Sequence, residues 1–278
     1  MIFSRRFVLD AGIRATLSVP LWMQMGLAQA AQRGPGRLPA VRAMPPSSRL
    51  VVIDPGHGGR DPGCIGAGNL YEKDIALATA WDFRNALARG GYDVLMTRTS
   101  DVFLPLTERV GIAETHKAAV LMSVHANSVA PNTVVRGASV FTFSNTPSDP
   151  LAAEIAKTEN SVERISNPTF HGVSPQVSRI LFSLMDQSTK AQSHLLQSKM
   201  VGSLARSVDM LQNPARHATF VVLQSAAIPS VLIETAFLSN PEDEAALRTN
   251  AFRMRLARSM KTALDAWFLA RKTAVANL

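Results

Sequence analysis

The chain has 278 residues, with 29 Lys and Arg against 21 Asp and Glu, so its formal net charge is +8 at neutral pH. Its length allows one large or two small domains with a real core, and its single cysteine, Cys64, excludes an internal disulfide. The positive charge suits an acidic polymer such as anionic lipid or a carboxylate-rich cell wall, whereas no run of Lys and Arg interleaved with aromatic residues indicates a nucleic-acid partner.

The N-terminus has the layout of an export signal over residues 1–30. Arg5 and Arg6 stand in SRRFVL, which looks like a twin-arginine motif, and the segment ends on the A-x-A cleavage site Ala28-Gln29-Ala30. Arg14 interrupts the apolar stretch between them, which is too short and too polar for a good membrane span. We therefore predict a cleaved signal, with no membrane insertion afterwards and delivery to the periplasm, and an uncleaved anchor as the alternative.

Residues 31–48, rich in Pro, Gly and Arg, are predicted to be a linker, and residues 49–278 a single domain. Apolar, β-branched runs predict strands at Leu50–Ile53, Tyr92–Thr97, Ala118–Val124, Ala138–Phe143, Thr219–Leu223 and Ser230–Ile233. Helical patterns occur at Glu72–Arg89, Thr107–Lys117, Pro150–Arg164, within Gln176–Leu211, and from Pro241 onward behind the cap Asn240. This alternation predicts an α/β fold with a mainly parallel, twisted sheet flanked by helices.

Three predicted strands lead into residues that bind metals or move protons. His57 follows the first strand, His125 follows Ala118–Val124, and Glu234 follows Ser230–Ile233. Glu72 opens the first helix, whose N-terminus can return to the end of the first strand. Each of these residues alone has a structural explanation, because histidines often cap strands and a glutamate suits a helix N-terminus.

Their joint placement is more informative, because the carboxyl ends of parallel strands meet at one edge of the sheet. Two histidines and one carboxylate suit a catalytic zinc ion with an open fourth position. We therefore predict His57, Glu72 and His125 as ligands of one Zn²⁺ ion and Glu234 as the general base. Gly56, which lies in PGHGG, lets the backbone pass close to the metal and the substrate.

The blocks DPGHGGRDPG, YEKDIAL, TRTSDVFLPLTERV, SVHANS, RGASVF and VLIETAFLSNPEDE occur in this order. They resemble the zinc-dependent N-acetylmuramoyl-L-alanine amidases that split bacterial septa, over about residues 50–268. The resemblance implies that His57, Glu72 and His125 bind zinc and that Glu234 is catalytic. It also implies cleavage of the amide between the lactyl group of N-acetylmuramic acid and the L-alanine of the stem peptide, during cell-wall remodelling and daughter-cell separation.

Some members of that family carry an inhibitory helix whose glutamate occupies the zinc until a partner with a LytM-type domain withdraws it. The resemblance places such a regulatory helical insertion at about residues 148–212 here. Within it we favour Glu159 as the inhibitory residue, over Glu154 and Glu163. A solvated helix face is the alternative.

Other interpretations stay open from the sequence. A zinc peptidase that cuts within the stem peptide would use similar ligands, and a non-catalytic wall-binding protein could share the fold. Asn127 is a candidate hydrogen-bond donor near the site or a strand cap. Cys64 fits a buried small residue, a fourth soft ligand or an oxidation-sensitive thiol. Arg98 and Arg109 are expected to support the fold through ion pairs, and no metal role is predicted for His116, His171, His194 and His217.

Overall fold

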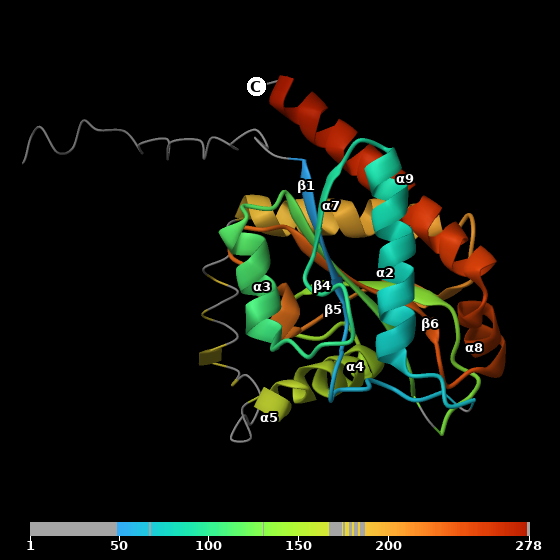
Figure 1. Ribbon diagram of the computed structural model, residues 1–278. Helices are drawn as coiled ribbons and strands as arrows, with labels where there is room; N and C mark the ends of the chain where they lie inside the picture. Colours follow the sequence, from blue (N-terminus) through green and yellow to red (C-terminus); the bar gives the residue numbers. More distant parts are fainter. Residues whose placement is uncertain are drawn as a thin grey trace, which may run out of the picture. The chain divides into compact units, whose positions relative to one another are not determined.

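The computed structural model describes residues 49–276 apart from 67, 130, 167–173, 175, 178, 179, 181, 182 and 184–186. The predicted signal at residues 1–30 and linker at residues 31–48 lie outside the described part. A six-stranded sheet in the order β2-β1-β3-β6-β4-β5 forms the centre of the domain (Figure 1). Its strands are β1 (Leu50–Pro55), β2 (Asp93–Met96), β3 (Val120–Asn127), β4 (Ala138–Phe143), β5 (Met210–Ala218) and β6 (Ser230–Phe237). All neighbouring pairs are parallel except β4–β6, which confirms the predicted α/β class with a mainly parallel sheet.

Helices cover both faces of this sheet. They are α2 (Glu72–Arg89), α3 (Leu106–Thr115), α4 (Pro150–Ser161), α5 (Glu163–Ser166), α7 (Gln187–Leu204), α8 (Pro241–Arg248) and α9 (Asn250–Ala276), with a 3-10 turn η1 (Val221–Leu223). The buried side chains of α2, α7 and α9 pack on one face, and those of α3, α4 and η1 pack on the other (Figure 1). The functional residues predicted from the sequence must therefore lie at the sheet edge between these two layers.

Two central strands are longer than predicted. The strand expected at Ala118–Val124 is β3, and the one expected at Ser230–Ile233 is β6, and each runs at least three residues further than the apolar run that indicated it. His125 and Glu234 therefore lie inside strands rather than after them, where they pair with each other in register. Because the ladder satisfies their backbone groups, a polar side chain does not end a strand at these positions.

The prediction of a strand at Thr219–Leu223 was wrong. Residues 221–223 form the 3-10 turn η1, and the strand of this region lies earlier, as β5 at Met210–Ala218. The first two residues of β5 belong to the segment predicted to be helical. The sequence of β5 (MLQNPARHA) is polar because β5 lies at the sheet edge, where Pro214 is tolerated beside a register irregularity. The residues of η1 are apolar because they pack under α3 and α4 rather than in the sheet.

The last predicted helix is two helices. Asn240 caps α8 as expected, since its Oδ1 accepts hydrogen bonds from the backbone N–H groups of Glu242 and Asp243. The chain then leaves helical geometry at Thr249 before α9 begins. The predicted stripe on α9 from Phe252 to Trp267 is buried in the main core as expected, but α9 packs mainly against α2 and α7 rather than on the sheet.

Helix α7 lies within the segment predicted to be helical between residues 176 and 211. Leu196, Met200 and Leu204 have no exposed surface and share the main core with α9. The segment at residues 148–212, in which the regulatory insertion was predicted, therefore has two parts. Helix α7 belongs to the main core, whereas α4 and α5 lie toward the other face of the sheet.

Two buried arginines hold the turn that follows β1. Arg109 Nη1 donates to Asp54 Oδ1 at 2.9 Å and to the Pro55 carbonyl at 2.7 Å, and its Nη2 donates to the His57 carbonyl at 2.8 Å. Arg98 Nη2 donates to the Gly56 carbonyl at 2.7 Å. The expected ion pair is confirmed for Arg109, whereas Arg98 binds carbonyl oxygens instead. These contacts satisfy the carbonyls of a turn in which His57 has a φ of 60°.

We expect Asp54→Asn to destabilise the protein by about 3–5 kcal/mol, because it leaves the charge of Arg109 buried without a partner. Urea unfolding at pH 7 measures this difference, and Asp93→Asn on exposed β2 is the control, expected within about 0.5 kcal/mol of the wild type. A loss below about 1 kcal/mol would contradict the role given to this ion pair.

The same substitution has an expected pH dependence. Burial by itself raises the pKa of Asp54, but the Arg109 charge and hydrogen bonds from Thr97 and Ser123 outweigh it and hold that pKa below the usual 3.8. Since a lowered carboxyl pKa contributes stability above the unfolded pKa, the advantage of the wild type over Asp54→Asn should shrink as the pH falls below about 4. A difference that stays constant over that range would contradict this assignment.

Candidate metal centre and active site

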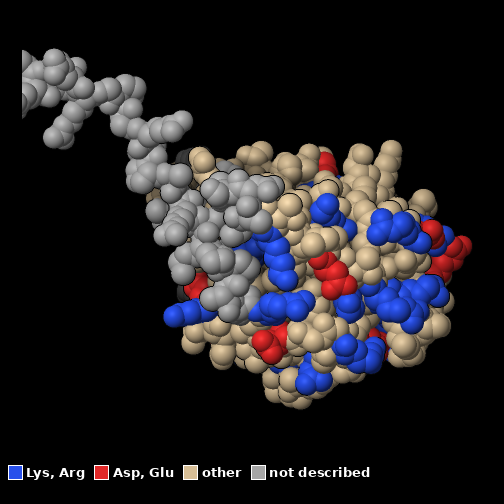
Figure 2. Space-filling model, turned by 90° about the horizontal axis from the view of Figure 1, so that it is seen from above, with Lys and Arg blue, Asp and Glu red and all other residues tan. Residues whose placement is uncertain are grey.

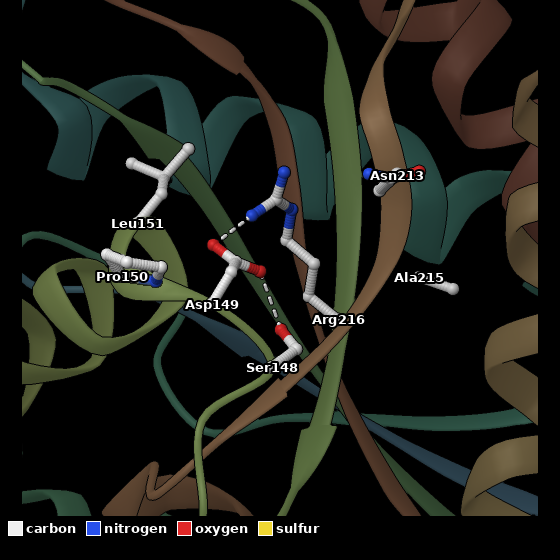
Figure 3. A pocket seen from close by; sticks show the side chains of 7 residues that line it. All are labelled: Ser148, Asp149, Pro150, Leu151, Asn213, Ala215 and Arg216. Atoms are coloured by element: carbon white, nitrogen blue, oxygen red, sulfur yellow. Dashed lines mark hydrogen bonds and ion pairs between the residues drawn. The ribbon is translucent and has the colours of Figure 1, made fainter.

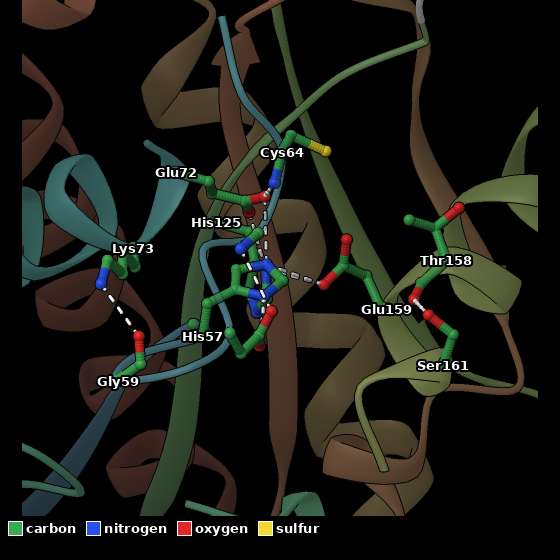
Figure 4. A network of polar contacts seen from close by, with 12 residues as sticks. His57, Gly59, Cys64, Glu72, Lys73, His125, Thr158, Glu159 and Ser161 are labelled. Carbon is green, nitrogen blue, oxygen red and sulfur yellow. Dashed lines mark hydrogen bonds and ion pairs between the residues drawn. The ribbon is translucent and has the colours of Figure 1, made fainter. Parts of the chain in front are cut away.

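Five side chains from five segments meet at the carboxyl edge of the central strands, and Figure 4 shows four of them, His57, Glu72, His125 and Glu159. His57 comes two residues after β1, His125 lies in β3, and Glu234 lies opposite His125 in β6. Glu72 is the first residue of α2, and Glu159 reaches the same place from α4. The structure thus brings together all five residues that the sequence singled out.

Four of these residues form a tight, buried cluster. His57, Glu72, His125 and Glu159 each offer one ligand atom, and these atoms all lie within 4.8 Å of one another. His57 Nε2 lies 3.0 Å from Glu72 Oε2 and 3.2 Å from Glu159 Oε2. His125 Nδ1 lies 3.0 Å from Glu72 Oε1 and 3.1 Å from the same Glu159 oxygen. None of the four residues is more than 5% exposed.

Asp61 orients the first histidine. Its Oδ2 accepts a hydrogen bond from His57 Nδ1 at 2.8 Å, which leaves Nε2 facing the cluster. A carboxylate that holds the second nitrogen of a histidine is the usual support of a metal ligand. Asp61 was not predicted, although its spacing of four residues from His57 in PGHGGRDPG was an available signal.

Backbone N–H groups hold the carboxylate of Glu72 from two sides. Its Oε2 accepts from Cys64 N at 2.9 Å, and its Oε1 accepts from Ala126 N at 3.0 Å. The cysteine therefore contributes through its backbone, and its sulfur points away from the histidine rings (Figure 4). Burial, followed by the nearby charge of Glu72, raises the pKa of the Cys64 thiol, so the thiol stays protonated.

The cluster places several ionisable groups out of water. Burial by itself lowers the pKa of His125, but the charges of Glu159 and Glu72 outweigh it and raise that pKa to about 10. The pKa of His57 is raised well above its usual value for the same reason, and that of Glu72 is lowered by the two histidines against the effect of burial. Two buried carboxylates at this separation require positive charge between them, either protons on the histidines or a cation.

Glu234 differs from the other carboxylates. It has no exposed surface, and neither of its carboxylate oxygens has a hydrogen-bond partner among the described residues. Burial and the charges of Glu159 and Glu72 raise its pKa well above the usual range, although His125 opposes them. An unsatisfied carboxylate in a buried site indicates a group that works on a water or a ligand.

The donor atoms fit a zinc ion. Two imidazole nitrogens and a carboxylate oxygen are a common set for catalytic zinc, and Glu159 offers an oxygen for the fourth position. His57 Nε2 makes no hydrogen bond in the described part of the chain, and its polar neighbours there are the carboxylate oxygens of Glu72 and Glu159, which are themselves candidate ligands. Asn127 Nδ2, buried at the end of β3, is likewise unpaired within that part.

The remaining histidines do not join this cluster. His116 and His194 are exposed, and His217 is half-buried in the edge strand β5. His171 lies outside the described residues.

A separate hollow lies between the start of α4 and β5 (Figure 3). Asp149 caps α4 by accepting from Ala152 N at 3.0 Å, and it also forms an ion pair with Arg216 of β5. This hollow contains none of the predicted site residues, and its contacts attach α4 to the sheet edge.

The C-terminal end of α4 has contacts of its own. Asn160 Nδ2 donates to the Thr219 carbonyl at 2.6 Å, and its Oδ1 accepts from Val221 N at 2.9 Å. Glu163 Oε2 accepts from Leu106 N at 2.9 Å, at the start of α3. Glu159 is thus held in the cluster by polar contacts on its C-terminal side.

Comparison with known proteins agrees with this fold. Residues 51–266 match the family Amidase_3, described as N-acetylmuramoyl-L-alanine amidase. The chain is 35% identical over 266 residues to N-acetylmuramoyl-L-alanine amidase AmiA of Salmonella typhimurium, covering 95% of this chain and 92% of that one. It is 33% identical over 217 residues to the amidase AmiC of Neisseria meningitidis, covering 78% of this chain and 52% of that one.

A solved structure, N-acetylmuramoyl-L-alanine amidase AmiC2 of Nostoc punctiforme, has the same fold with a TM-score of 0.57. The two chains are 27% identical, and the match covers 78% of this chain and 96% of that one. The extent of these matches, together with the agreement in fold, leads to one conclusion: the chain belongs to the Amidase_3 family of N-acetylmuramoyl-L-alanine amidases.

Proposed function

We propose that the chain is a zinc-dependent enzyme that hydrolyses the amide between the lactyl group of N-acetylmuramic acid and the L-alanine of peptidoglycan stem peptides. Its role would be cell-wall remodelling and the separation of daughter cells. The observation that carries the proposal is the buried group of His57, Glu72 and His125, whose ligand atoms converge beside Glu234 in an enzyme of this family.

His57, Glu72 and His125 would hold one Zn²⁺ ion, with Asp61 fixing the orientation of the first histidine. When bound, zinc supplies a Lewis acid for the lactyl carbonyl and lowers the pKa of a water to about 7. The residues on the chain keep this centre dry, since none of its side chains is more than 5% exposed.

Glu234 would move the protons. Its free carboxylate takes a proton from the attacking water and delivers it to the departing amine of L-alanine. The raised pKa of Glu234, caused first by burial, suits a residue that must accept a proton and release it in one cycle.

We expect Glu234→Gln to lower kcat by about 10²- to 10⁴-fold, because an amide cannot accept the proton. Zinc content, measured by atomic absorption, should stay at the wild-type level, since Glu234 is outside the proposed ligand set. Retained turnover would remove Glu234 from its role, whereas loss of zinc would make it a ligand instead.

Glu159 would act as an inhibitor that occupies the fourth zinc position. Its carboxylate lies 3.2 Å from His57 and 3.1 Å from His125, and α4 carries it into the cluster from the regulatory segment that we place at α4 and α5. A partner with a LytM-type domain would withdraw it. Such a plug must be held by only a few kcal/mol for a partner to shift it.

We expect Glu159→Ala to raise basal amidase activity by about tenfold or more, because the fourth zinc position opens to water. Glu154→Ala is the matched control, since Glu154 is exposed on the same helix and lies outside the cluster. Initial rates on purified sacculi measure the effect. Equal activity of the Glu159→Ala and wild-type proteins would exclude Glu159 as the inhibitor.

Export would bring the enzyme to its substrate. The predicted signal at residues 1–30 would direct the chain to the periplasm by the twin-arginine route, and residues 31–48 would link it to the catalytic domain at residues 49–278. Among the residues that the structure describes, no helix is long and apolar enough to cross a membrane. Residues 1–30 carry three Arg and one Asp, so the exported chain would have a net charge of +6; this charge, part of which Figure 2 shows on one face, would favour the carboxylates of peptidoglycan as the partner surface.

Mass spectrometry of products from purified sacculi tests the whole proposal, with and without a zinc chelator. We expect free stem peptides that begin at L-alanine, and their loss with the chelator. Fragments cut inside the peptide would instead identify a zinc peptidase. No product from either the wild-type or the Glu159→Ala protein would favour a non-catalytic wall-binding protein.

A further inference from the structure

The loop at residues 58–71, described except for residue 67, joins the first histidine of the cluster to Glu72. It supplies two of the contacts that shape the cluster. Asp61 orients the ring of His57, and the backbone N–H of Cys64 holds the Glu72 carboxylate. The position of this loop therefore bears directly on the positions of two of the proposed ligands.

The tip of the loop is fastened to α8, more than 170 residues away in the sequence. Glu244 Oε1 accepts a hydrogen bond from Gly68 N at 3.0 Å, and Arg248 Nη2 donates to the Gly68 carbonyl at 2.9 Å. Arg248 Nη2 also donates to Glu244 Oε1 at 2.7 Å, so the two side chains form a clamp on the backbone of one residue, Gly68.

The fit around this clamp is close. Glu244 is 5% exposed although it carries a carboxylate. A Cβ at Gly66 would lie 2.8 Å from Glu244 Cδ, and one at Gly68 would lie 2.7 Å from Glu244 Oε1. A side chain at either position would have to displace the end of Glu244, whereas glycine lets the loop approach it closely. The mechanism proposed above makes no use of this buried carboxylate.

The neighbouring residues at the start of α8 bind the backbone of two other segments. Asp243 Oδ2 accepts from Phe237 N at the end of β6 and from Gly137 N before β4, at 2.9 and 2.7 Å. Asn240 Nδ2 donates to the Thr133 carbonyl at 2.7 Å. The start of α8 thus joins the loop after β1 to the loop after β3.

We propose that Glu244, supported by Arg248, is a positioning residue for the metal centre: it fixes the 58–71 loop so that Asp61 and the Cys64 N–H hold His57 and Glu72 in ligand geometry. This inference rests on the proposed zinc site. Glu244 touches neither substrate nor metal, and it acts through the loop. Loss of the outer partners of metal ligands typically lowers metal affinity by about 10- to 100-fold.

The test compares Glu244→Gln with Glu242→Gln, in the full chain. Gln keeps the size of Glu244 but loses the charge that binds Arg248 and weakens the bond to Gly68. Glu242 is the matched control, because it lies in the same turn of α8 and is exposed, and its partner is exposed Arg136. Thermal unfolding of each variant reports whether the fold as a whole is affected.

Two readouts separate positioning from general stability. The zinc affinity of the metal-free protein, measured by competition with a chromogenic chelator, should fall about tenfold or more in Glu244→Gln and stay unchanged in Glu242→Gln. The rate at which a thiol reagent labels Cys64, the single cysteine, should rise about tenfold, because the loop that partly buries it opens more often.

Each outcome decides the question. Weaker zinc binding together with faster labelling supports the proposal, and unchanged values overturn it. Faster labelling with unchanged zinc affinity also overturns it, because the loop would then move without affecting the ligands. If Glu244→Gln does not fold, Arg248→Met applies the same test from the other side of the clamp. Wild-type protein that binds no zinc would reject the proposed function itself, independently of Glu244.

Discussion

The buried ion pair between Arg109 and Asp54 is the interaction on which the site depends. The pair anchors the end of β1, and the remaining donors of the guanidinium bind the carbonyls of Pro55 and His57. Those carbonyls belong to a turn with a positive φ at a histidine, a conformation that is unfavourable without such support. The hydroxyl of Ser123 on β3 donates to the other oxygen of Asp54, so the turn is also tied to the neighbouring strand. The core therefore fixes the backbone of the first histidine, whereas Asp61 in the loop that follows orients its ring.

The cluster itself is a balance of buried charges. Three glutamates and two histidines share a space with almost no solvent exposure, and the direction of every pKa shift follows from that crowding. Hydrogen bonds fix Glu72 from two backbone groups, whereas Glu234 has none in the described structure. Glu72 is therefore fixed in position, as a metal ligand would be, whereas Glu234 is free to accept and release a proton.

The sequence predicted the parts of this picture that depend on local pattern. His57, Glu72 and His125 could be found because each follows or opens a regular element with a clear apolar period. The in-register pairing of His125 with Glu234 could not, because strand order and register depend on contacts between distant segments. The edge strand β5 was not predicted, because an edge strand need not be apolar. The break at Thr249 was not predicted either, because helical patterns continue on both sides of it. Glu244 had no signal at all, since its partner Gly68 is remote in the sequence and the contact is made through the backbone.

Helix α4 has a second face that bears on how Glu159 can leave the cluster. The apolar face of α4 packs into a buried cluster with residues of β4, β6 and the segment before η1. This cluster includes Ala152, Ile155, Ala156, Phe141, Phe220 and Leu232. The helix that carries the Glu159 carboxylate therefore also covers an apolar layer. Moving the whole helix away would expose that layer to water, at a free-energy cost of about 25 cal/mol for each Å² of apolar surface exposed. A partner that removes α4 completely would have to bring an apolar surface of its own to replace it. A partner without such a surface could act on the last turn of α4 and the start of α5 alone, where Asn160 and Glu163 make polar contacts that water can replace.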